Sequence, residues 1–391
     1  MKATFKKDDL AFAVKAVCGF AVPRISLTIL GNILIRAEGD KAVFTAYDKA
    51  VFTAYDLESH VRCEAPAEIE RSGAVTVPAR TFSEIVRVLP DADVRVELEG
   101  SRVRVSCESL GYDLATLDPD DFPSWPDVKP TTAIELPQKA LARILEKTVF
   151  AIPSNDPRRV LLGGFFDVDG RALKTVATDG KKLAFVRTEV ESLEGEPKAA
   201  AIVPRKVLAE VGKTLGDEWS AKILFGGRQV AFDLGQATYV ANRIEGAYPS
   251  YEQVIPKSFE RTVFMPREPL RSLVRQAAVV SDEVTHSVVM RFEDDGLRLS
   301  AMTYDVGSYA GSLTVEYDQE PFEIAFNHRF VGEVLGLIDG ERVVFKTNTA
   351  TSPAVFCGED VDDALFVVMP VRLSKDLGGN AQNAGEEVNG E

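Results

Sequence analysis

Residues 77–86, VPARTFSEIV, have the pattern of a strand end followed at once by a helix, and this stretch occurs three times in the chain. The other copies are residues 203–211, VPRKVLAEV, and residues 326–335, FNHRFVGEVL, and the three align without gaps. In each copy a base is followed four residues later by an acid, among apolar residues at helical spacing. The repeat therefore predicts one structural unit that is used three times.

Further segments repeat in the same order around this stretch. A second amphipathic helix is predicted upstream in each copy, with proline in the first turn of two of them. Alternating apolar residues with Gly and Asp turns predict strands joined by hairpins. We therefore expect an α+β fold of three repeated domains, each with two helices packed on antiparallel sheets. The upstream helices are residues 5–17, 136–149 and 265–280, and the strand segments are residues 37–48, 94–107, 167–180, 221–234 and 293–305.

Two segments rich in Pro and Asp or Ser, residues 117–130 and 248–260, separate the repeats. We expect domain boundaries that give domains at 1–129, 130–257 and 258–373. Residues 374–391 are rich in Gly, Asn and Glu and nearly without apolar residues, which predicts a disordered tail.

The composition is that of a globular protein, with 45% apolar and 27% charged residues among 391. No run approaches the roughly 18 apolar residues that a spanning helix needs, and acids and lysines interrupt the N-terminus where an export signal would be apolar. We therefore expect a cytoplasmic protein. The four cysteines and three histidines lack metal-ligand spacing, so neither a metal nor a cofactor is expected.

The net charge of −15 argues against a nucleic-acid partner unless the bases are gathered on one surface. They do recur at helical spacing. A solvated helix face is the alternative for any single helix, but three like charges at i, i+4, i+8 repel each other and favour an anionic partner. Because no aromatic residues alternate with these bases, we expect sequence-independent, salt-sensitive contacts with the backbone of a polyanion, and neither base readout nor stacking on single strands. The stripes are Lys139, Arg143, Lys147 and Arg267, Arg271, Arg275 on the first helices, and Arg80, Arg87 and Lys206, Lys213 on the second helices.

Several strings together resemble one known family, the β subunit of bacterial DNA polymerase III, or DNA sliding clamp. The similarity covers residues 1–373 in order. The strings are LTILGNILI (27–35), TVPAR (76–80), LDPDDFPSWP (117–126), TVATDGKKLA (175–184), IVPRK (202–206), AYPSYEQVIP (247–256) and FVVMPVRL (366–373).

The resemblance implies a non-catalytic protein that encircles duplex DNA and tethers the replicative polymerase to it. It implies a head-to-tail homodimer that forms a six-domain ring, loading by a clamp loader, and a groove for peptide motifs of the polymerase α subunit and other partners. It implies DNA contacts at Arg24, Arg80, Arg205 and Lys206, and a dimer contact of Tyr112 and Leu114 with Val279 and Val280. It implies a partner groove lined by Leu161, Thr178, Gly180, Lys182, Leu183, Pro249, Val254, Asn327, Phe330, Val367, Met369, Pro370, Val371 and Arg372.

Two other functions are compatible with parts of the sequence. Acid clusters such as residues 118–121 could serve an enzyme, but acids beside Gly and Pro are usually turn formers, and no GxxxxGK[ST], HExxH or GxSxG string is present. A protein-binding scaffold that never touches nucleic acid would also fit three repeats. The basic stripes count against it.

An identical octapeptide, KAVFTAYD, occurs in tandem at residues 41–48 and 49–56. The interval from Leu10 to Asp48 equals that from Leu141 to Asp179, so we expect the first copy in the strand and the second as an insertion. Either copy can fill the strand with the same residues inward, because a shift by an even number of residues preserves the two faces.

Overall fold

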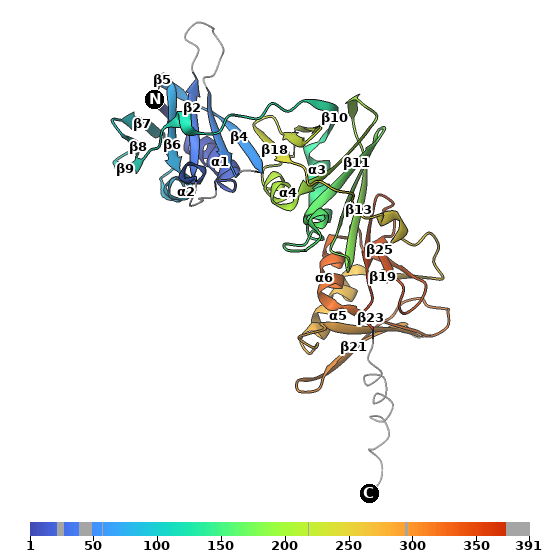
Figure 1. Ribbon diagram of the computed structural model, residues 1–391. Helices are drawn as coiled ribbons and strands as arrows, with labels where there is room; N and C mark the ends of the chain where they lie inside the picture. The colour runs from blue at the N-terminus through green and yellow to red at the C-terminus, as the bar shows by residue number, and fades with distance from the viewer. Residues whose placement is uncertain (22–26, 39–48, 57, 218, 294–295, 373–391) are drawn as a thin grey trace. The chain divides into compact units, whose positions relative to one another are not determined.

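The structure is a computed structural model that describes residues 1–21, 27–38, 49–56, 58–217, 219–293 and 296–372. The chain divides into two compact units (Figure 1). The first comprises Met1–Leu145, Gly163–Leu173 and Thr188–Gly246, and the second comprises Glu146–Leu162, Lys174–Arg187 and Ala247–Glu391.

The second helix of each repeat starts directly after a strand, as predicted. Pro78 and Pro204 stand at the junction in the first two repeats. Proline suits this position because it lacks the N–H that a helix start leaves unpaired. In the third repeat Asn327 stands at this junction, and its side chain caps the helix by accepting a hydrogen bond from the Arg329 N–H at 2.9 Å. These helices are α2 (Ala79–Val88), α4 (Arg205–Gly212) and α6 (His328–Leu337).

The first helix of each repeat also forms as predicted, with one correction. In the second repeat Pro137 is the last residue of the preceding strand and not a residue of the first helical turn, whereas in the third repeat Pro269 lies in the first turn of the helix, as predicted. The apolar face is buried: on α5, Leu270, Val274 and Ala277 are at most 2% exposed. These helices are α1 (Lys7–Cys18), α3 (Gln138–Val149) and α5 (Arg267–Ala278).

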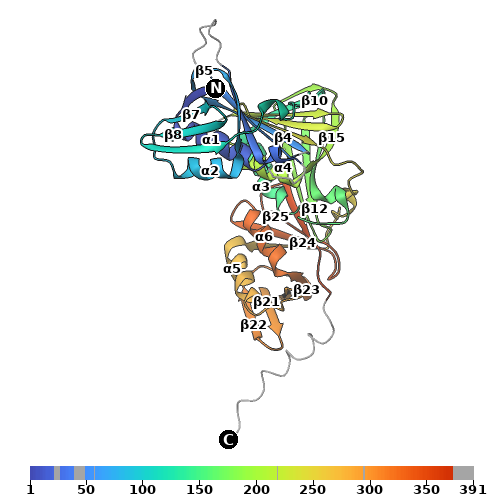
Figure 2. The ribbon, with the colours of Figure 1, turned by 60° about the vertical axis from the view of Figure 1, so that its left-hand side comes forward.

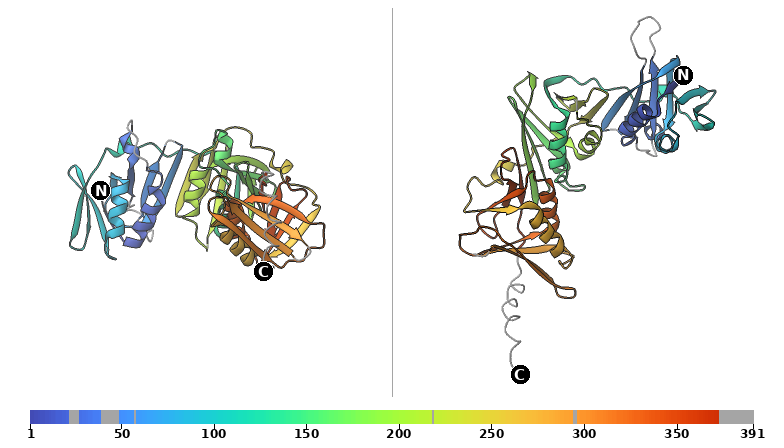
Figure 3. Two further views of the ribbon diagram at one scale, coloured as in Figure 1. Left: turned by 90° about the horizontal axis from the view of Figure 1, so that it is seen from below. Right: turned by 180° about the vertical axis from the view of Figure 1, so that it is seen from behind.

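In the first unit, α1 packs against α2 (Figure 3). A nine-stranded sheet joins the first two repeats through antiparallel pairing of β18 with β4, where Tyr239 faces Val61. Its order is β14 (Ser192–Gly195), β10 (Pro130–Pro137), β16 (Ser220–Gly226), β17 (Gln229–Asp233), β18 (Ala237–Asn242), β4 (Ser59–Pro66), β3 (Lys49–Tyr55), β2 (Asn32–Glu38), β6 (Gly73–Pro78). A five-stranded sheet has the order β5 (Glu68–Arg71), β1 (Lys2–Phe5), β7 (Val94–Glu99), β8 (Arg102–Cys107), β9 (Leu110–Ala115). Strand β11 (Gly163–Asp169) pairs with β15 (Lys198–Pro204), and the short 3-10 helices are η1 (Thr28–Gly31) and η2 (Pro119–Asp121).

In the second unit, α5 and α6 lie side by side (Figure 2). The rings of Phe292, Phe326, Phe345 and Phe356 form its aromatic core, with centroids 5.2 to 6.2 Å apart. One run of strands is β13 (Lys182–Glu189), β26 (Ala364–Val368), β25 (Ala354–Gly358), β24 (Arg342–Thr347), β19 (Arg261–Pro266), and β12 (Ala172–Thr178) precedes β13 in the chain. A four-stranded sheet has the order β22 (Gly307–Leu313), β21 (Gly296–Thr303), β20 (Ser287–Glu293), β23 (Phe322–Asn327), and the short helices are η3 (Arg159–Leu162) and η4 (Tyr251–Gln253).

The second copy of the tandem octapeptide forms a strand of the sheet, so the prediction that this copy would be the insertion was wrong. Strand β3 is the second copy, and its Ala50, Phe52 and Ala54 are fully buried. Asp56 ends the strand in a turn, where its Oδ1 accepts the Ser59 N–H at 2.8 Å. This copy lies next to the turn that leads into β4. Residues 41–48 lie outside the described residues.

The predicted i,i+4 ion pair of the second helices forms in the first repeat alone among the described residues. Arg80 Nε lies 3.2 Å from Glu84 Oε1. In the second repeat Lys206 pairs with Asp56 and Glu210 pairs with Lys213. In the third repeat Glu333 pairs with Lys182. Lys206 and Glu333 are thus paired with residues from elsewhere in the fold, whereas Glu210 has a partner at the end of its own helix.

Across the described ranges, no helix is both long enough and apolar enough to cross a bilayer.

Candidate functional site

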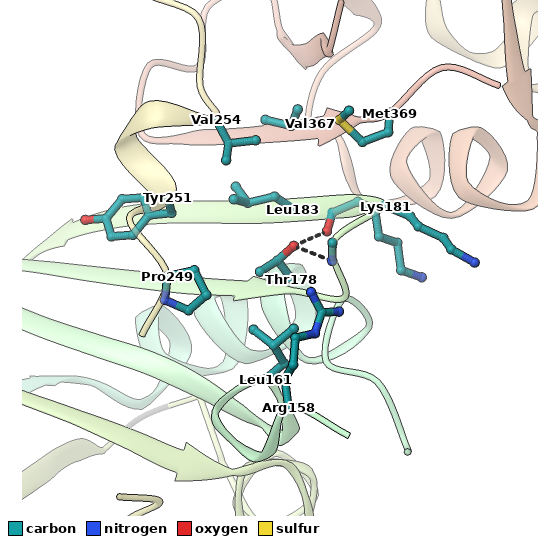
Figure 4. Close-up of a pocket in the computed structure, with 12 residues that line it drawn as sticks. Arg158, Leu161, Thr178, Lys181, Leu183, Pro249, Tyr251, Val254, Val367 and Met369 are labelled. Atoms are coloured by element: carbon teal, nitrogen blue, oxygen red, sulfur yellow. Dashed lines mark hydrogen bonds between the residues drawn. The ribbon is translucent and has the colours of Figure 1, made fainter. Parts of the chain in front are cut away.

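A pocket of about 220 Å³ lies in the second unit, lined by residues that are far apart in the sequence. Figure 4 shows Leu161, Leu183, Val254 and Val367 around the same space, each from a different element. The full lining is Arg158, Leu161, Thr178, Gly180, Lys181, Lys182, Leu183, Pro249, Tyr251, Val254, Val367 and Met369.

The β12–β13 turn shapes one wall of the pocket. Asp179 Oδ1 accepts the N–H groups of Lys181 and Lys182, each at 2.8 Å, and Thr178 Oγ1 donates to the Lys182 carbonyl at 2.7 Å. Gly180 occupies φ +85°, a conformation that L side chains rarely adopt. The turn TDGKK is therefore a rigid support, and the N–H of Met369 binds it at the Lys181 carbonyl, 2.8 Å away.

The floor of the pocket is apolar, and its rim leaves apolar atoms in water. Leu161, Leu183 and Val367 are at most 3% exposed, while Val254 and Met369 are 40% and 37% exposed. Covering apolar surface of this kind yields about 25 cal/mol for each Å² removed from water. The pocket is suited to an aliphatic or aromatic side chain of a partner.

Arg158 forms the opposite rim. Its guanidinium holds Asp156 through two hydrogen bonds of 2.9 Å, and it donates to the Asp179 carbonyl at 3.1 Å. The hydrogen bonds from Arg158 lower the pKa of Asp156 to about 2. The pair therefore stays ionised at neutral pH.

Lys182 is a buried cation in the pocket wall, 8% exposed. Its ammonium lies 2.5 Å from Glu333 Oε2 and faces the rings of Phe150 and Phe330, with centroids at 4.9 and 5.0 Å. One carboxylate and two π faces thus surround the charge.

The structure brings together most of the residues predicted for the partner groove, namely Leu161, Thr178, Gly180, Lys182, Leu183, Pro249, Val254, Val367 and Met369. The others do not line the cavity. Asn327 caps α6, Phe330 contacts the Lys182 ammonium, and Val371 donates its N–H to the Ala325 carbonyl at 2.8 Å, with Pro370 and Arg372 as its chain neighbours. Arg158, Lys181 and Tyr251 were missed, although Lys181 and Tyr251 fall inside the quoted strings 175–184 and 247–256.

Most of the predicted DNA contacts are on the surface. The exposed ones are Arg80, Arg87, Lys139, Arg205, Lys213 and Arg275; Arg143, Lys206, Arg267 and Arg271 are partly buried. Lys206 is held by Asp56, and its ammonium lies 5.0 Å from the Phe20 ring centroid. Arg24 lies outside the described residues.

The prediction that Lys147 shares an exposed face with Lys139 was wrong. Lys147 is 3% exposed, lies 3.0 Å from Asp339 Oδ1 and donates to the Leu337 carbonyl. Arg267 donates to the neighbouring Ile338 carbonyl. Helix α6 has no basic residue in its last turn. Two cations from other elements therefore bind the negative end of this helix.

The residues predicted for the dimer contact lie at edges or ends of their own elements. Tyr112 and Leu114 are on β9, the outer strand of the five-stranded sheet, and Leu114 is itself only 8% exposed. Val279 follows α5 and is 79% exposed; Val280 accepts a hydrogen bond from Thr303 Oγ1 at 2.7 Å.

No cluster of three or more His, Cys, Asp or Glu side chains suited to a metal occurs among the described residues.

Comparisons with known proteins assign the chain to a family. Three family models match in order: the N-terminal domain of the DNA polymerase III beta subunit at residues 1–126, its central domain at 135–250 and its C-terminal domain at 252–372. The beta sliding clamp of Vibrio cholerae is 32% identical over 375 residues, covering 95% of this chain and 100% of that protein.

Solved structures agree over the same span. A sliding clamp from Pseudomonas aeruginosa bound to griselimycin has a TM-score of 0.89 at 28% identity, and the C. crescentus beta sliding clamp has a TM-score of 0.85 at 31% identity. Each comparison covers 95% of this chain and 100% of the other. The chain therefore belongs to the DNA polymerase III beta subunit family, the non-catalytic sliding clamps of DNA replication.

Proposed function

We propose that this chain encircles double-stranded DNA as a head-to-tail homodimer, a closed ring of six domains. The observation that carries the proposal is the set of exposed bases on the repeated helices of an acidic chain. Arg80, Lys139, Arg205 and Arg275 lie on α2, α3, α4 and α5. Since they can reach phosphates without reading bases, binding is independent of sequence, and the ring holds DNA by topology.

Lys147 is not part of the proposed DNA surface, because its ammonium binds Asp339 and the Leu337 carbonyl at the end of α6. The remaining bases divide by exposure. We assign the principal phosphate contacts to the exposed Arg80, Arg87, Lys139, Arg205, Lys213 and Arg275, and supporting contacts to the partly buried Arg143, Lys206, Arg267 and Arg271. Arg24, which lies outside the described residues, is proposed as a DNA contact from the family resemblance alone.

The dimer contact joins β9 of one protomer to the end of α5 and the strand β22 of the other. Strands β9 and β22 are both outer strands of their sheets, so each offers backbone groups on one side. Val279 at 79% and Val306 at 65% exposure add apolar surface beside them, and Tyr112, Leu114 and Val280 complete the contact. An obligate interface is richer in apolar area than the rest of the surface.

The pocket receives short linear segments of partner proteins: the α subunit of the replicative polymerase, the clamp loader and other proteins that carry a clamp-binding motif. Its apolar floor and rim support this assignment. The C. crescentus neighbour is described with PEG bound at a putative beta-motif tethering region, which is consistent with such a site. Pro370, Val371 and Arg372, with Asn327 and Phe330, would extend the groove past the pocket.

The domain boundaries that accompany this function are 1–129, 130–257 and 258–373, followed by a tail at 374–391. A clamp acts where the chromosome is replicated, so we place the protein in the cytoplasm.

The pocket assignment is tested by Met369→Ala, because Met369 contributes flexible apolar surface at the rim. The probe is a fluorescein-labelled peptide with the clamp-binding motif of the same organism's polymerase α subunit, and its binding is followed by anisotropy. We expect a loss of affinity of about tenfold, with the dimer intact by sedimentation. Met302→Ala is the matched control, since Met302 is 45% exposed on β21 and does not line the pocket. Equal affinity of the two variants would place the partner site elsewhere.

A further inference from the structure

Lys182 and its chain neighbour Lys181 both line the pocket, but their charges are placed differently. Lys181 is exposed and makes no side-chain ion pair with any residue that the structure describes. Lys182 is 8% exposed, and its ammonium is held by Glu333 of α6 at 2.5 Å. One cation is thus free in water at the rim, whereas the other is drawn into the wall.

The surroundings of the Lys182 ammonium leave little of its charge for a ligand. An ammonium has three N–H donors. Glu333 accepts one of them, and the rings of Phe150 and Phe330, at 4.9 and 5.0 Å, present their negative faces. What remains of Lys182 to line the pocket is its aliphatic stem, as lysine stems often cover apolar surface.

Each copy of the repeat has an acid at the same position, and in the third copy this acid is Glu333. Among the described residues, Glu333 is the one acid of the three that forms an ion pair with a residue of another element. Glu84 pairs with Arg80 and Glu210 with Lys213, each within its own helix or at its end. Glu333 instead reaches Lys182, which lies 151 residues away in the sequence. Arg329, four residues before Glu333, remains exposed.

We propose that Glu333 is a positioning residue of the pocket: by holding the Lys182 ammonium against Phe150 and Phe330, it keeps positive charge out of the ligand space and makes the pocket select uncharged apolar anchors. This inference rests on the proposed partner-binding function of the pocket. Any preference for acidic residues in a partner then belongs to the rim, at Lys181, and not to the pocket floor.

Removal of the carboxylate predicts a specific failure. In Glu333→Gln the Lys182 ammonium loses its counter-charge in a site that water barely reaches, and the long stem lets it turn outward into the pocket. An apolar anchor must then displace a hydrated cation, whereas an acidic anchor gains a partner.

The binding experiment compares the fluorescein-labelled clamp-binding peptide with a version in which one apolar anchor is replaced by aspartate. For Glu333→Gln we expect about tenfold weaker binding of the first peptide, stronger binding of the second, and a larger salt dependence. Lys182→Met keeps the stem and removes the charge, and its affinity for the first peptide is the reference for the double variant. The double variant Lys182→Met/Glu333→Gln should match Lys182→Met. Glu84→Gln, at the equivalent position of the first repeat, is the control and should change neither affinity.

Two results of this experiment would overturn the proposal. If Glu333→Gln binds both peptides like the unsubstituted protein, the carboxylate does not control the pocket. If the double variant is as weak as Glu333→Gln, Glu333 supports the fold and does not act through Lys182.

A second measurement does not require any peptide to bind. Brief labelling with acetic anhydride, followed by mass spectrometry, should modify Lys182 several-fold faster in Glu333→Gln than in the unsubstituted protein, with Lys181 unchanged. Equal protection of Lys182 in both proteins would contradict the positioning role. A protein that fails to bind the peptide but shows the faster labelling would contradict the proposed function alone.

Discussion

His60 is a titratable side chain held in a partly buried aromatic cluster of the first unit. Its ring stacks on Tyr55 with centroids 3.9 Å apart and meets Trp125 edge-on at 6.0 Å. Burial lowers the pKa of His60 to about 4, against a smaller opposing effect of Asp56. Because the folded state disfavours the protonated imidazole, the folded state is favoured above the ordinary pKa of 6.5 and loses stability as the pH falls from 6.5 towards 4.

We expect His60→Phe, which keeps an aromatic ring but cannot titrate, to lose less stability than the unsubstituted protein between pH 7 and pH 4.5. Urea unfolding at the two pH values measures the difference, with the first unit followed through tryptophan fluorescence, since Trp125 and Trp219 both belong to it. Identical pH dependence in both proteins would show that the imidazole is as accessible to protons in the folded state as in the unfolded state.

Lys147 illustrates how a residue predicted for DNA contributes to stability instead. We expect Lys147→Glu to lower the free energy of unfolding by about 2–4 kcal/mol, because it removes the partner of Asp339 and places a second negative charge at the C-terminal end of α6. Lys139→Glu on the same helix is the control: Lys139 is exposed, so its stability should change by at most about 0.5 kcal/mol.

Two measurements distinguish these variants: denaturant unfolding should change in Lys147→Glu, and DNA binding should change in Lys139→Glu. Lys139→Glu should weaken binding to DNA while it leaves unfolding unchanged. If Lys147→Glu unfolds like the unsubstituted protein, the contact with α6 contributes nothing measurable.

At the scale of elements, periodicity was a sufficient guide to the helices and hairpins. Amphipathic spacing predicted α2, α4 and α6, and Gly-containing turns predicted the hairpins of β7 with β8 and β16 with β17. These features depend on neighbours in the sequence, so the sequence carries them directly.

The ion-pair partners could not be predicted in the same way. Lys206 binds Asp56, which is 150 residues away in the sequence. Lys147 donates to the Leu337 carbonyl at the end of α6, which is 190 residues away. Local spacing suggested Glu210 for Lys206 and a free surface for Lys147. Tertiary packing determined both partners, because an ammonium that is removed from water binds the acceptor that the fold places beside it. The pocket was largely predictable for a different reason, since the family strings include nearly all of its lining.

The sequence that forms β3 occurs twice in the chain, at residues 41–48 and 49–56. Removal of residues 41–48 or of residues 49–56 yields the same polypeptide, so a deletion tests whether one copy suffices but not which copy is used. We expect the deleted chain to fold and dimerise, because β3 needs a single copy to pair with β2 and β4.

Point substitutions distinguish the copies. Phe52 is fully buried and packs edge-on against Phe5 at 5.6 Å, so a Phe→Ala change there would ordinarily cost about 3–5 kcal/mol. We expect Phe44→Ala to cost nothing measurable and Phe52→Ala to cost less than that range, since a shift by one copy would bring an intact phenylalanine into the strand. The double variant should show the full loss in denaturant unfolding. A full loss in Phe52→Ala alone would mean that the first copy cannot replace the second.

At the scale of the whole molecule, the account combines a net charge of −15 with exposed bases on repeated helices. Such a protein is held on DNA weakly by charge, and the charge contribution is screened by salt. A closed ring, by contrast, releases DNA only when the ring opens or when a DNA end passes through it.

The most direct measurement is retention of the loaded protein on nicked circular DNA at high salt, before and after the circle is cut once. After loading by the clamp loader and ATP, the protein should stay on the circle at a salt concentration that abolishes its binding without loading. Linearisation should then release it within the time needed to slide to an end. Equal retention on circular and linear DNA would contradict a topological link and, with it, the central claim that this chain works as a closed clamp.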